Sequence, residues 1–169
     1  MKCLLVLLAC GLPLITASCG YKIGGLVNGS LKGMSTFDVK MFENQTVHPY
    51  VAMQMTTALA DAMQSDGTFR MASPADSDFS VSGTVTSVAL SSLTSDPDDS
   101  YISREIGLAV NVDYCITNRK TGEVIKKGTV SGSGSYFNTA GNVQAARDAA
   151  LSSASTQAAQ ELVNIMTLP

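Results

Sequence analysis

Residue types that build catalytic and metal sites are scarce in this chain of 169 residues. It has one histidine, His48, no tryptophan and only four cysteines. It contains no Gly-x-Ser-x-Gly, His-Glu-x-x-His or Cys-x-x-Cys motif and no phosphate-binding glycine loop. His48 stands next to Pro49, where a turn before a helix is the expected role. We therefore expect a protein that is not an enzyme and that holds no cofactor and no metal.

Low basic charge and low cysteine content exclude two further classes. The chain has 11 basic and 14 acidic side chains, so it offers no electrostatic basis for nucleic-acid binding. Two of the four cysteines lie within the first 18 residues, which leaves only Cys19 and Cys115 in the rest of the chain. Two cysteines cannot form a disulfide framework or a cysteine metal site.

The chain also lacks an apolar run of about 20 residues, the length that a transmembrane helix needs. Its one hydrophobic run, residues 4–15, follows Lys2 and is followed by Ala17, Ser18 and Cys19. A basic residue, an apolar core and small residues in this order are typical of a signal peptide. A cysteine directly after the cleavage site is typical of bacterial lipoproteins, so we predict cleavage after residue 18 and lipidation of the Cys19 thiol. The alternative is a secreted protein in which this thiol is ordinary.

The mature chain is expected to begin with a tether and continue as one domain. Residues 19–35 are rich in glycine and show no periodicity, which is typical of a flexible segment. Residues 36–169 are long enough to build a core without disulfides. We therefore divide the chain into a signal peptide (1–18), a lipidated tether (19–35) and a single α+β domain (36–169).

A strand and a helix open this domain. Residues 36–42 alternate between apolar and polar side chains, which predicts a half-buried strand with Met41 on its inner face. Pro49 suits the first turn of a helix, and Gly67 ends the helical pattern. The methionines of this helix are expected to fill a core, with an adaptable binding groove as the alternative. The apolar positions of the helix are Val51, Met55, Ala58, Leu59, Ala62 and Met63.

Three longer strands and a second helix follow. Residues 79–90 alternate with a change of phase after Val85, which predicts a bulge. Residues 108–116 alternate without interruption, and a hairpin loop ending at Gly122 leads to the glycine-rich strand 124–137. From Asn142 the pattern is helical again, with small residues four apart that allow a close approach to a sheet. The order predicts an α+β fold with a four-stranded mixed sheet and two helices packed on one face.

The complete series of landmarks resembles the LPS-assembly lipoproteins of the LptE family. The four residues from Cys19 to Lys22 are similar to the lipidated start of that family. The most specific part is Phe42 to Thr46 (Phe-Glu-Asn-Gln-Thr) after the first strand, followed by Pro49 and a helix. Further landmarks follow in the family's order, so the resemblance covers most of residues 19–165. They are Thr57, Leu59, Asp66-Gly67, Phe69-Arg70, Ala75-Asp76 and Val81-x-Gly83.

The resemblance implies a non-enzymatic lipoprotein that sits as a plug inside an outer-membrane β-barrel of the LptD type. Members of the family help this barrel to assemble and contact lipopolysaccharide on its way to the cell surface. Gly20 stands where enteric bacteria place the aspartate that retains lipoproteins in the inner membrane. We therefore expect an outer-membrane, lipid-anchored protein that faces the periplasm. The alternative is an accessory lipoprotein of another envelope complex, for secretion or cell-wall assembly.

Lipopolysaccharide is polyanionic, so a protein that contacts it should present lysine or arginine to its phosphates. The one dense basic cluster lies at the second hairpin and the start of the strand after it: Arg119, Lys120, Lys126 and Lys127. On charge alone we predict these four as lipopolysaccharide contacts, with a solvated hairpin tip as the alternative. The serine- and threonine-rich outer faces of the strands suit enclosure by a polar barrel lumen, although ordinary solvent exposure would give the same pattern.

Overall fold

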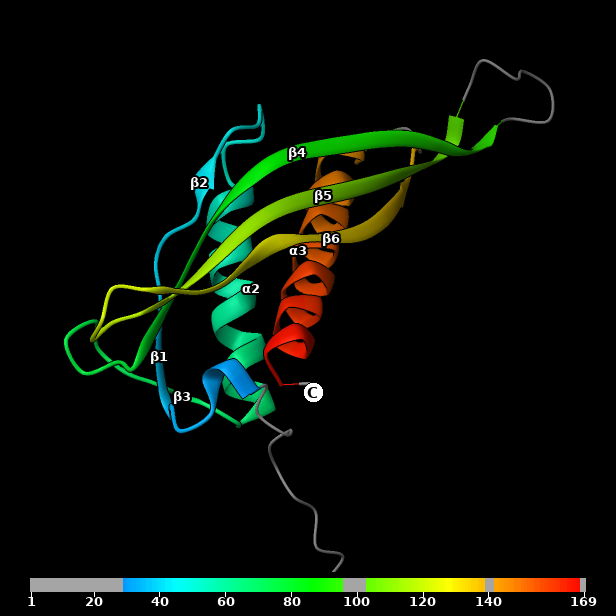
Figure 1. Ribbon diagram of the computed structural model, residues 1–169. Coiled ribbons are helices and arrows are strands. Elements are labelled where there is room, and N and C mark those ends of the chain that lie inside the picture. Colours follow the sequence, from blue (N-terminus) through cyan, green and yellow to red (C-terminus); the bar gives the residue numbers. More distant parts are fainter. Residues whose placement is uncertain (1–28, 96–102, 139–141, 168–169) are drawn as a thin grey trace, which may run out of the picture.

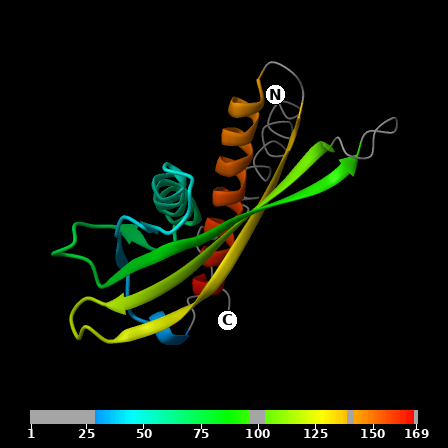
Figure 2. The ribbon, with the colours of Figure 1, turned by 90° about the horizontal axis from the view of Figure 1, so that it is seen from above.

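The computed structural model describes residues 29–95, 103–138 and 142–167, which form a sheet with two helices on one face (Figures 1 and 2). The predicted signal peptide, Cys19 and the first part of the predicted tether lie outside the described residues. The α+β class and the placement of both helices on one face are confirmed. Within the described residues, no helix has the length and hydrophobicity to cross a membrane.

The sheet is mixed and has six strands, two more than predicted. Its order is β3-β1-β4-β5-β6, and β2 also pairs with β4. The first three strands pair in parallel, whereas β4, β5 and β6 form an antiparallel meander. The two additional strands have only two residues each, too few to leave an alternating pattern in the sequence. The bounds are β1 Thr36–Val39, β2 Glu43–Asn44, β3 Arg70–Met71, β4 Phe79–Ser95, β5 Ser103–Asn118 and β6 Val124–Phe137.

The first predicted strand ends three residues early, at Val39, because the chain bends around Gly83 of β4. The aromatic ring of Phe42 packs where a Cβ atom of Gly83 would lie, and the Phe42 N–H donates to Thr56 Oγ1 at 3.0 Å. Phe42 is therefore buried, and Met41, which the alternation placed inside, is 66% exposed. The expectation for Met41 was wrong because alternation cannot continue through such a bend.

Strands β4 and β5 pair over almost their whole length and carry the predicted bulge. Val85 faces Val112 and Ser87 faces Asn111, so Thr86 is the extra residue. Because of this extra residue, the side chain of Val88 points toward the core, as the change of phase in the sequence requires. Beyond the bulge, β4 and β5 continue, with β6 paired to β5 as far as Glu105, and the far end of these strands projects past the helices (Figure 1). We call this end the projecting arm.

Helix α2, Val51–Asp66, begins after Pro49 and ends at Gly67, whose φ of 72° is left-handed. Met55 and Met63 are buried among the aromatic rings and aliphatic side chains of the core, as predicted for this helix. Met53, on the opposite side, is 50% exposed. The methionines of α2 therefore divide between core and surface.

Helix α3, Val143–Thr167, lies directly beneath β6 and runs in the same direction as α2 (Figure 1). A Cβ atom on Gly132 would collide with the carbonyl oxygen of Ala154, and one on Gly134 with that of Ala150. Small residues on both elements thus let the helix backbone touch the strand, as the alanine spacing predicted. The buried face of α3 continues through Ala158, Leu162 and Met166.

Residues 29–35, the last part of the predicted tether, pack against the domain. Gly29–Leu31 form a short 3-10 helix, η2, and the side chain of Leu31 is only 2% exposed. The N–H groups of Ser35 and Thr36 both donate to a carboxylate oxygen of Asp78, at 3.0 and 3.1 Å. Regular packing therefore begins before the predicted boundary at residue 36.

Candidate functional site

The structure does not bring the four predicted basic residues to one surface. Arg119 and Lys120 lie in the β5–β6 turn and both have acidic partners. The Arg119 Nε atom is 3.2 Å from Asp38 Oδ1, and its guanidinium also donates to the carbonyl of Pro74 at 2.7 and 3.1 Å. Lys120 Nζ is 2.9 Å from Asp78 Oδ1. We call this part of the molecule, where the hairpin turn is tied to residues 73–78, the clamped end.

The carboxylates of Asp38 and Asp78 accept the hydrogen bonds that hold the clamped end together. The Asp38 carboxylate is 4% exposed and also accepts hydrogen bonds from Ser77 and Ser80, at 2.6 and 3.0 Å. The Ser35 N–H, followed by the Lys120 ammonium group and Thr36, holds the pKa of Asp78 well below its usual range. Asp78 therefore remains charged at neutral pH, and the two carboxylates hold the basic side chains in place.

Lys126 and Lys127 are neighbours in β6 and point to opposite faces of the sheet. Lys126 pairs with the buried Ile116 and donates to the carbonyl of Ile165, at 3.4 Å, at the end of α3. Lys127 pairs with Cys115 and faces away from the helices. We call the surface opposite the helices the open face. Of the predicted cluster, only Lys127 lies on it without an acidic partner in the described part of the chain.

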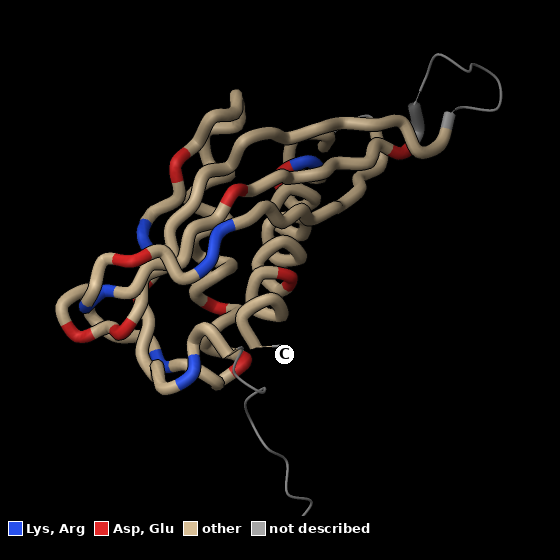
Figure 3. Tube along the Cα trace, in the orientation of Figure 1, with Lys and Arg blue, Asp and Glu red and all other residues tan. Residues whose placement is uncertain are grey.

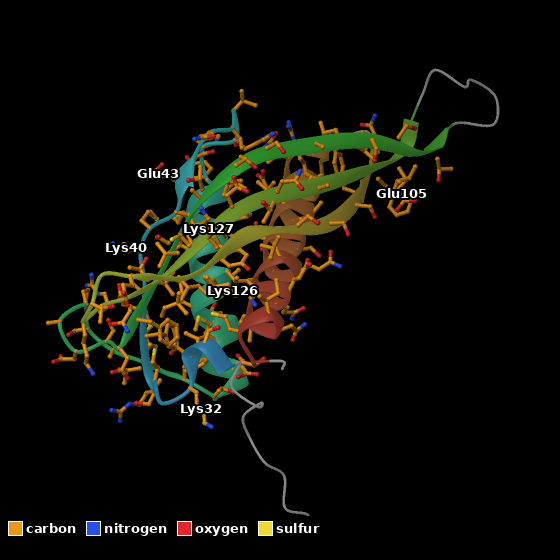
Figure 4. All side chains as sticks on the ribbon, in the orientation of Figure 1. Lys32, Lys40, Glu43, Glu105, Lys126 and Lys127 are labelled. Carbon is orange, nitrogen blue, oxygen red and sulfur yellow. The ribbon has the colours of Figure 1, made fainter. Side chains whose placement is uncertain are left out.

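Lys127 lines a shallow depression of about 450 Å³ on the open face together with Lys40, Glu43 and Asp113. Lys40 comes from the bend between β1 and β2 and is distant from Lys127 in the sequence, so residue spacing could not group the two lysines (Figure 4). Neither lysine forms an ion pair within the described residues. Asp113 is held by Thr129, whose hydroxyl donates to it at 2.7 Å. The depression can therefore offer two ammonium groups to an anionic ligand.

Many small polar side chains of the open face bond to one another. Asn111 donates to Ser87 Oγ at 2.9 Å, and Ser135 donates to Glu105 Oε1 at 2.8 Å. Toward the projecting arm, a less polar hollow is lined by Ala89, Ala109 and Leu93. Charged residues are few along this part of the sheet (Figure 3), so the face suits either solvent or the polar lumen of a barrel.

Two other hollows suit an anion less well. One, of about 310 Å³ at the start of α2 and α3, has Asp148 and His48 among its lining residues and no lysine or arginine. Burial lowers the pKa of His48, and the nearby Arg147 guanidinium, 3.1 Å from Nε2, lowers it further. The imidazole is thus neutral at pH 7. The groove between the helices is lined by Asp61 and Asp66 and, unlike the depression, by no lysine that could offset their repulsion of anions.

Cys115 is a free, half-buried thiol on the open face, 3.7 Å from the Thr117 hydroxyl. No group of three or more histidine, cysteine, aspartate or glutamate side chains in the described ranges could hold a metal ion.

A family model identifies the family of this chain. Residues 34–166 match the model of the LptE family, described as lipopolysaccharide-assembly. The chain belongs to the LptE family. The resemblance inferred from the sequence landmarks is therefore confirmed, and the match covers both helices and every strand of the sheet. LptE proteins are lipopolysaccharide-assembly lipoproteins of the bacterial envelope, and this is the level at which the function of the chain is known.

Solved structures share the fold of this LptE-family chain at low sequence identity. Protein XCC0632 from Xanthomonas campestris has a TM-score of 0.55 and 14% identity, over 86% of this chain and 92% of its own. The hypothetical protein CT253 from Chlamydia trachomatis has a TM-score of 0.51 and 7% identity, over 79% and 93%. The rare lipoprotein B from Shewanella oneidensis is less similar, with a TM-score of 0.47 and 14% identity over 75% and 93%, and adds no support for a shared fold. Among curated proteins, none matches this chain.

Proposed function

We propose that this LptE-family chain is a non-enzymatic, lipid-anchored outer-membrane protein that occupies a β-barrel of the LptD type and supports delivery of lipopolysaccharide to the cell surface. The observation that carries the proposal is the family match over residues 34–166. Lipidation at Cys19 would anchor the chain, since each buried CH₂ contributes about 0.8 kcal/mol and stable anchoring needs at least two acyl chains.

The open face supports the plug function. Its hydroxyl and amide side chains bond to one another, and the lumen of a transmembrane barrel is itself polar. The projecting arm adds Leu93, an exposed apolar side chain over Gly107 of the neighbouring strand. A partner that encloses the sheet would cover both kinds of surface.

Of the four basic residues predicted to contact lipopolysaccharide, the geometry favours one. Arg119 and Lys120 are neutralised by Asp38 and Asp78, and Lys126 bonds to the end of α3. Lys127 is the member of the cluster that can reach a phosphate from the open face, and Lys40 joins it. We propose this lysine pair as the phosphate contact, at the depression that they share with Glu43 and Asp113.

The test of the proposed function is a detergent pull-down of the tagged mature protein, followed by mass spectrometry. A stoichiometric outer-membrane barrel of the LptD type supports the proposal. Recovery with a different envelope complex, for secretion or cell-wall assembly, would replace it with the alternative function. Recovery of the lipoprotein alone would overturn the plug function.

The lysine pair is tested with the purified protein and fluorescent lipopolysaccharide. Changing Lys40→Gln and Lys127→Gln together should weaken binding by about tenfold in low salt, because two charge-assisted contacts are removed. The matched control combines Lys120→Gln with Lys126→Gln, which removes the same two charges away from the depression and should leave binding nearly unchanged. Equal losses in both variants would show that only net charge matters.

A further inference from the structure

Strand β6 forms a free edge of the sheet. It ends the strand order, and β5 is its only neighbour within the described residues. In an antiparallel pair, alternate residues direct both N–H and C=O toward the partner strand or away from it. The N–H of Ser133 points away from β5, because it donates to Gln157 Oε1 of α3 at 2.6 Å.

The direction of the other residues in β6 follows from the register. Pairing runs without a shift from Ile116↔Lys126 to Glu105↔Phe137. Every second residue counted from Ser133 therefore directs its N–H and C=O outward. These residues are Thr129, Ser131, Ser133, Ser135 and Phe137.

This edge lacks the features that normally prevent pairing with another chain. Exposed edges are usually interrupted by lysine, proline or a bulge, or are covered by another element. Residues 128–137 contain no lysine, no proline and no shift in register. Among the side chains that the structure describes, that of Gln157 is the one that bonds to this outward edge. The opposite edge strand, β3, has only two residues.

A groove follows the free edge on the side of α3. It has a volume of about 700 Å³, and Gln157 lies in it. The Gln157 Oε1 atom accepts from both the N–H and the hydroxyl of Ser133, at 2.6 and 2.8 Å. This carbonyl thus stands where the carbonyl of an added strand would accept a hydrogen bond. The groove is lined by small and uncharged side chains: Ser133, Ala149, Ser152, Ser153, Thr156, Gln157 and Gln160.

We propose that residues 128–137 of β6 are a docking edge for an extended, uncharged polar segment of the barrel partner. The segment adds to the sheet as a further strand and replaces the Gln157 amide with its own carbonyl groups. Its alternate side chains lie over the serine, threonine and glutamine side chains of α3, which explains its uncharged character. The inference rests on the proposed function for the identity of the partner.

A second copy of this chain does not fit the edge in antiparallel pairing, which keeps the helices of both copies on the same side of the shared sheet. Glycines at positions 132 and 134 put α3 directly beneath β6. The edge strands of such a pair would be about 4.8 Å apart, whereas packed helices need about 8–10 Å between their axes, so the two α3 helices would collide. Parallel pairing would put the helices on opposite sides of the sheet, and the exchange measurement below distinguishes that dimer. The proposed occupant is a strand with no helix beneath it, and since the wall strands of a closed barrel have no free edge, it is a loop or terminal segment of the barrel protein.

The experiment compares Ser131→Pro with Ser131→Ala in the full-length protein, expressed together with the LptD-type barrel. Proline removes the outward N–H and is tolerated on an edge strand, whereas alanine keeps the N–H and removes only the hydroxyl. We expect Ser131→Pro to reduce recovery of the barrel about tenfold, through lost backbone hydrogen bonds and the clash of its ring, and Ser131→Ala to leave it unchanged. Circular dichroism checks that both variants are folded.

Amide hydrogen exchange on the unmodified complex gives a second measurement that does not depend on a variant. Docking should slow exchange at Thr129, Ser131 and Ser135 at least about tenfold relative to the free protein. Unchanged exchange at these amides, or full barrel recovery with folded Ser131→Pro, would overturn the docking edge while the barrel still co-purifies. Edge protection without the barrel, from a dimer or from residues 19–28, would overturn it as well. Failure of the unmodified protein to recover the barrel would instead reject the proposed function.

Discussion

The clamped end and the free edge of β6 use polar groups in opposite ways. At the clamped end, Arg119 and Lys120 are each matched by a carboxylate, and the loops are fixed by short hydrogen bonds. Along the free edge, no strand of the described residues lies beside the outward N–H and C=O groups, and most of the side chains are small hydroxyls. Arg119 and Lys120, two of the four residues in the densest basic cluster, therefore form ion pairs that stabilise the fold. The edge suited to a protein partner, residues 128–137, contains no charged residue.

The largest expected effect is a loss of stability on the helix-facing side of β6, and its control is a substitution on the open face of the same strand. Gly132→Ala should destabilise the protein by about 3 kcal/mol, because its Cβ atom would strike the α3 backbone, which cannot yield without moving the helix. Ser131→Ala, one residue away, should change stability by less than about 0.5 kcal/mol. Urea unfolding followed by circular dichroism measures both. Similar values for the two variants would mean that α3 does not constrain β6.

A smaller loss is expected when the clamped end is broken. Arg119→Ala should destabilise the protein by about 2 kcal/mol, since it leaves the buried Asp38 carboxylate without its cation, while the partial exposure of Arg119 reduces the cost. Lys120→Ala, whose side chain is 77% exposed, should cost less than about 1 kcal/mol.

Leu93→Ser on the projecting arm provides the matched control for the clamped end. Leu93 is 57% exposed, so its replacement should change the free energy of unfolding by less than about 0.5 kcal/mol. Thermal unfolding compares the variants. If the arm variant were as destabilised as Arg119→Ala, the distinction between a structural end and an exposed arm would fail.

The smallest effect concerns the pH dependence of the clamped end. Because the folded-state pKa of Asp78 lies below its unfolded value of about 4, the stabilisation is complete above that value and is lost as the pH falls below it. Stability measured between pH 6 and pH 2 should therefore decline less steeply for Asp78→Asn than for the unmodified protein. Parallel pH profiles would show that Asp78 is not held by Ser35 and Lys120.

The fold was largely predictable because its main elements have regular patterns. The helix between Pro49 and Gly67, the bulge after Val85 and the close approach of α3 all follow from local sequence chemistry, and each is confirmed. The exposure of Met41 and the strand β2 were not predictable, because they depend on packing between segments distant in sequence. Phe42 over Gly83 is such a contact.

The candidate site was less predictable, for a geometric reason. Four basic residues close in sequence were expected to act together, but alternation sends Lys126 and Lys127 to opposite faces. The acidic partners of Arg119 and Lys120 come from residues about 40 to 80 positions earlier in the chain. Lys40 joins Lys127 only through the parallel pairing of β1 with β4. Residue spacing alone could have separated the two lysines of β6, whereas no local signal pointed to Lys40.

The topology also implies an order of folding. Strands β4, β5 and β6 pair through consecutive hairpins, and α3 follows them directly, so these contacts close short loops early. The parallel pairing of β1 with β4 and the bonds from Ser35 and Thr36 to Asp78 close a loop of about 40 residues, which costs more chain entropy. We therefore expect the N-terminal strand to dock late on a nearly complete sheet. Chains at this stage of folding would expose the edge of β4 at residues 79–85 as well as the edge of β6 to partners and to misassembly.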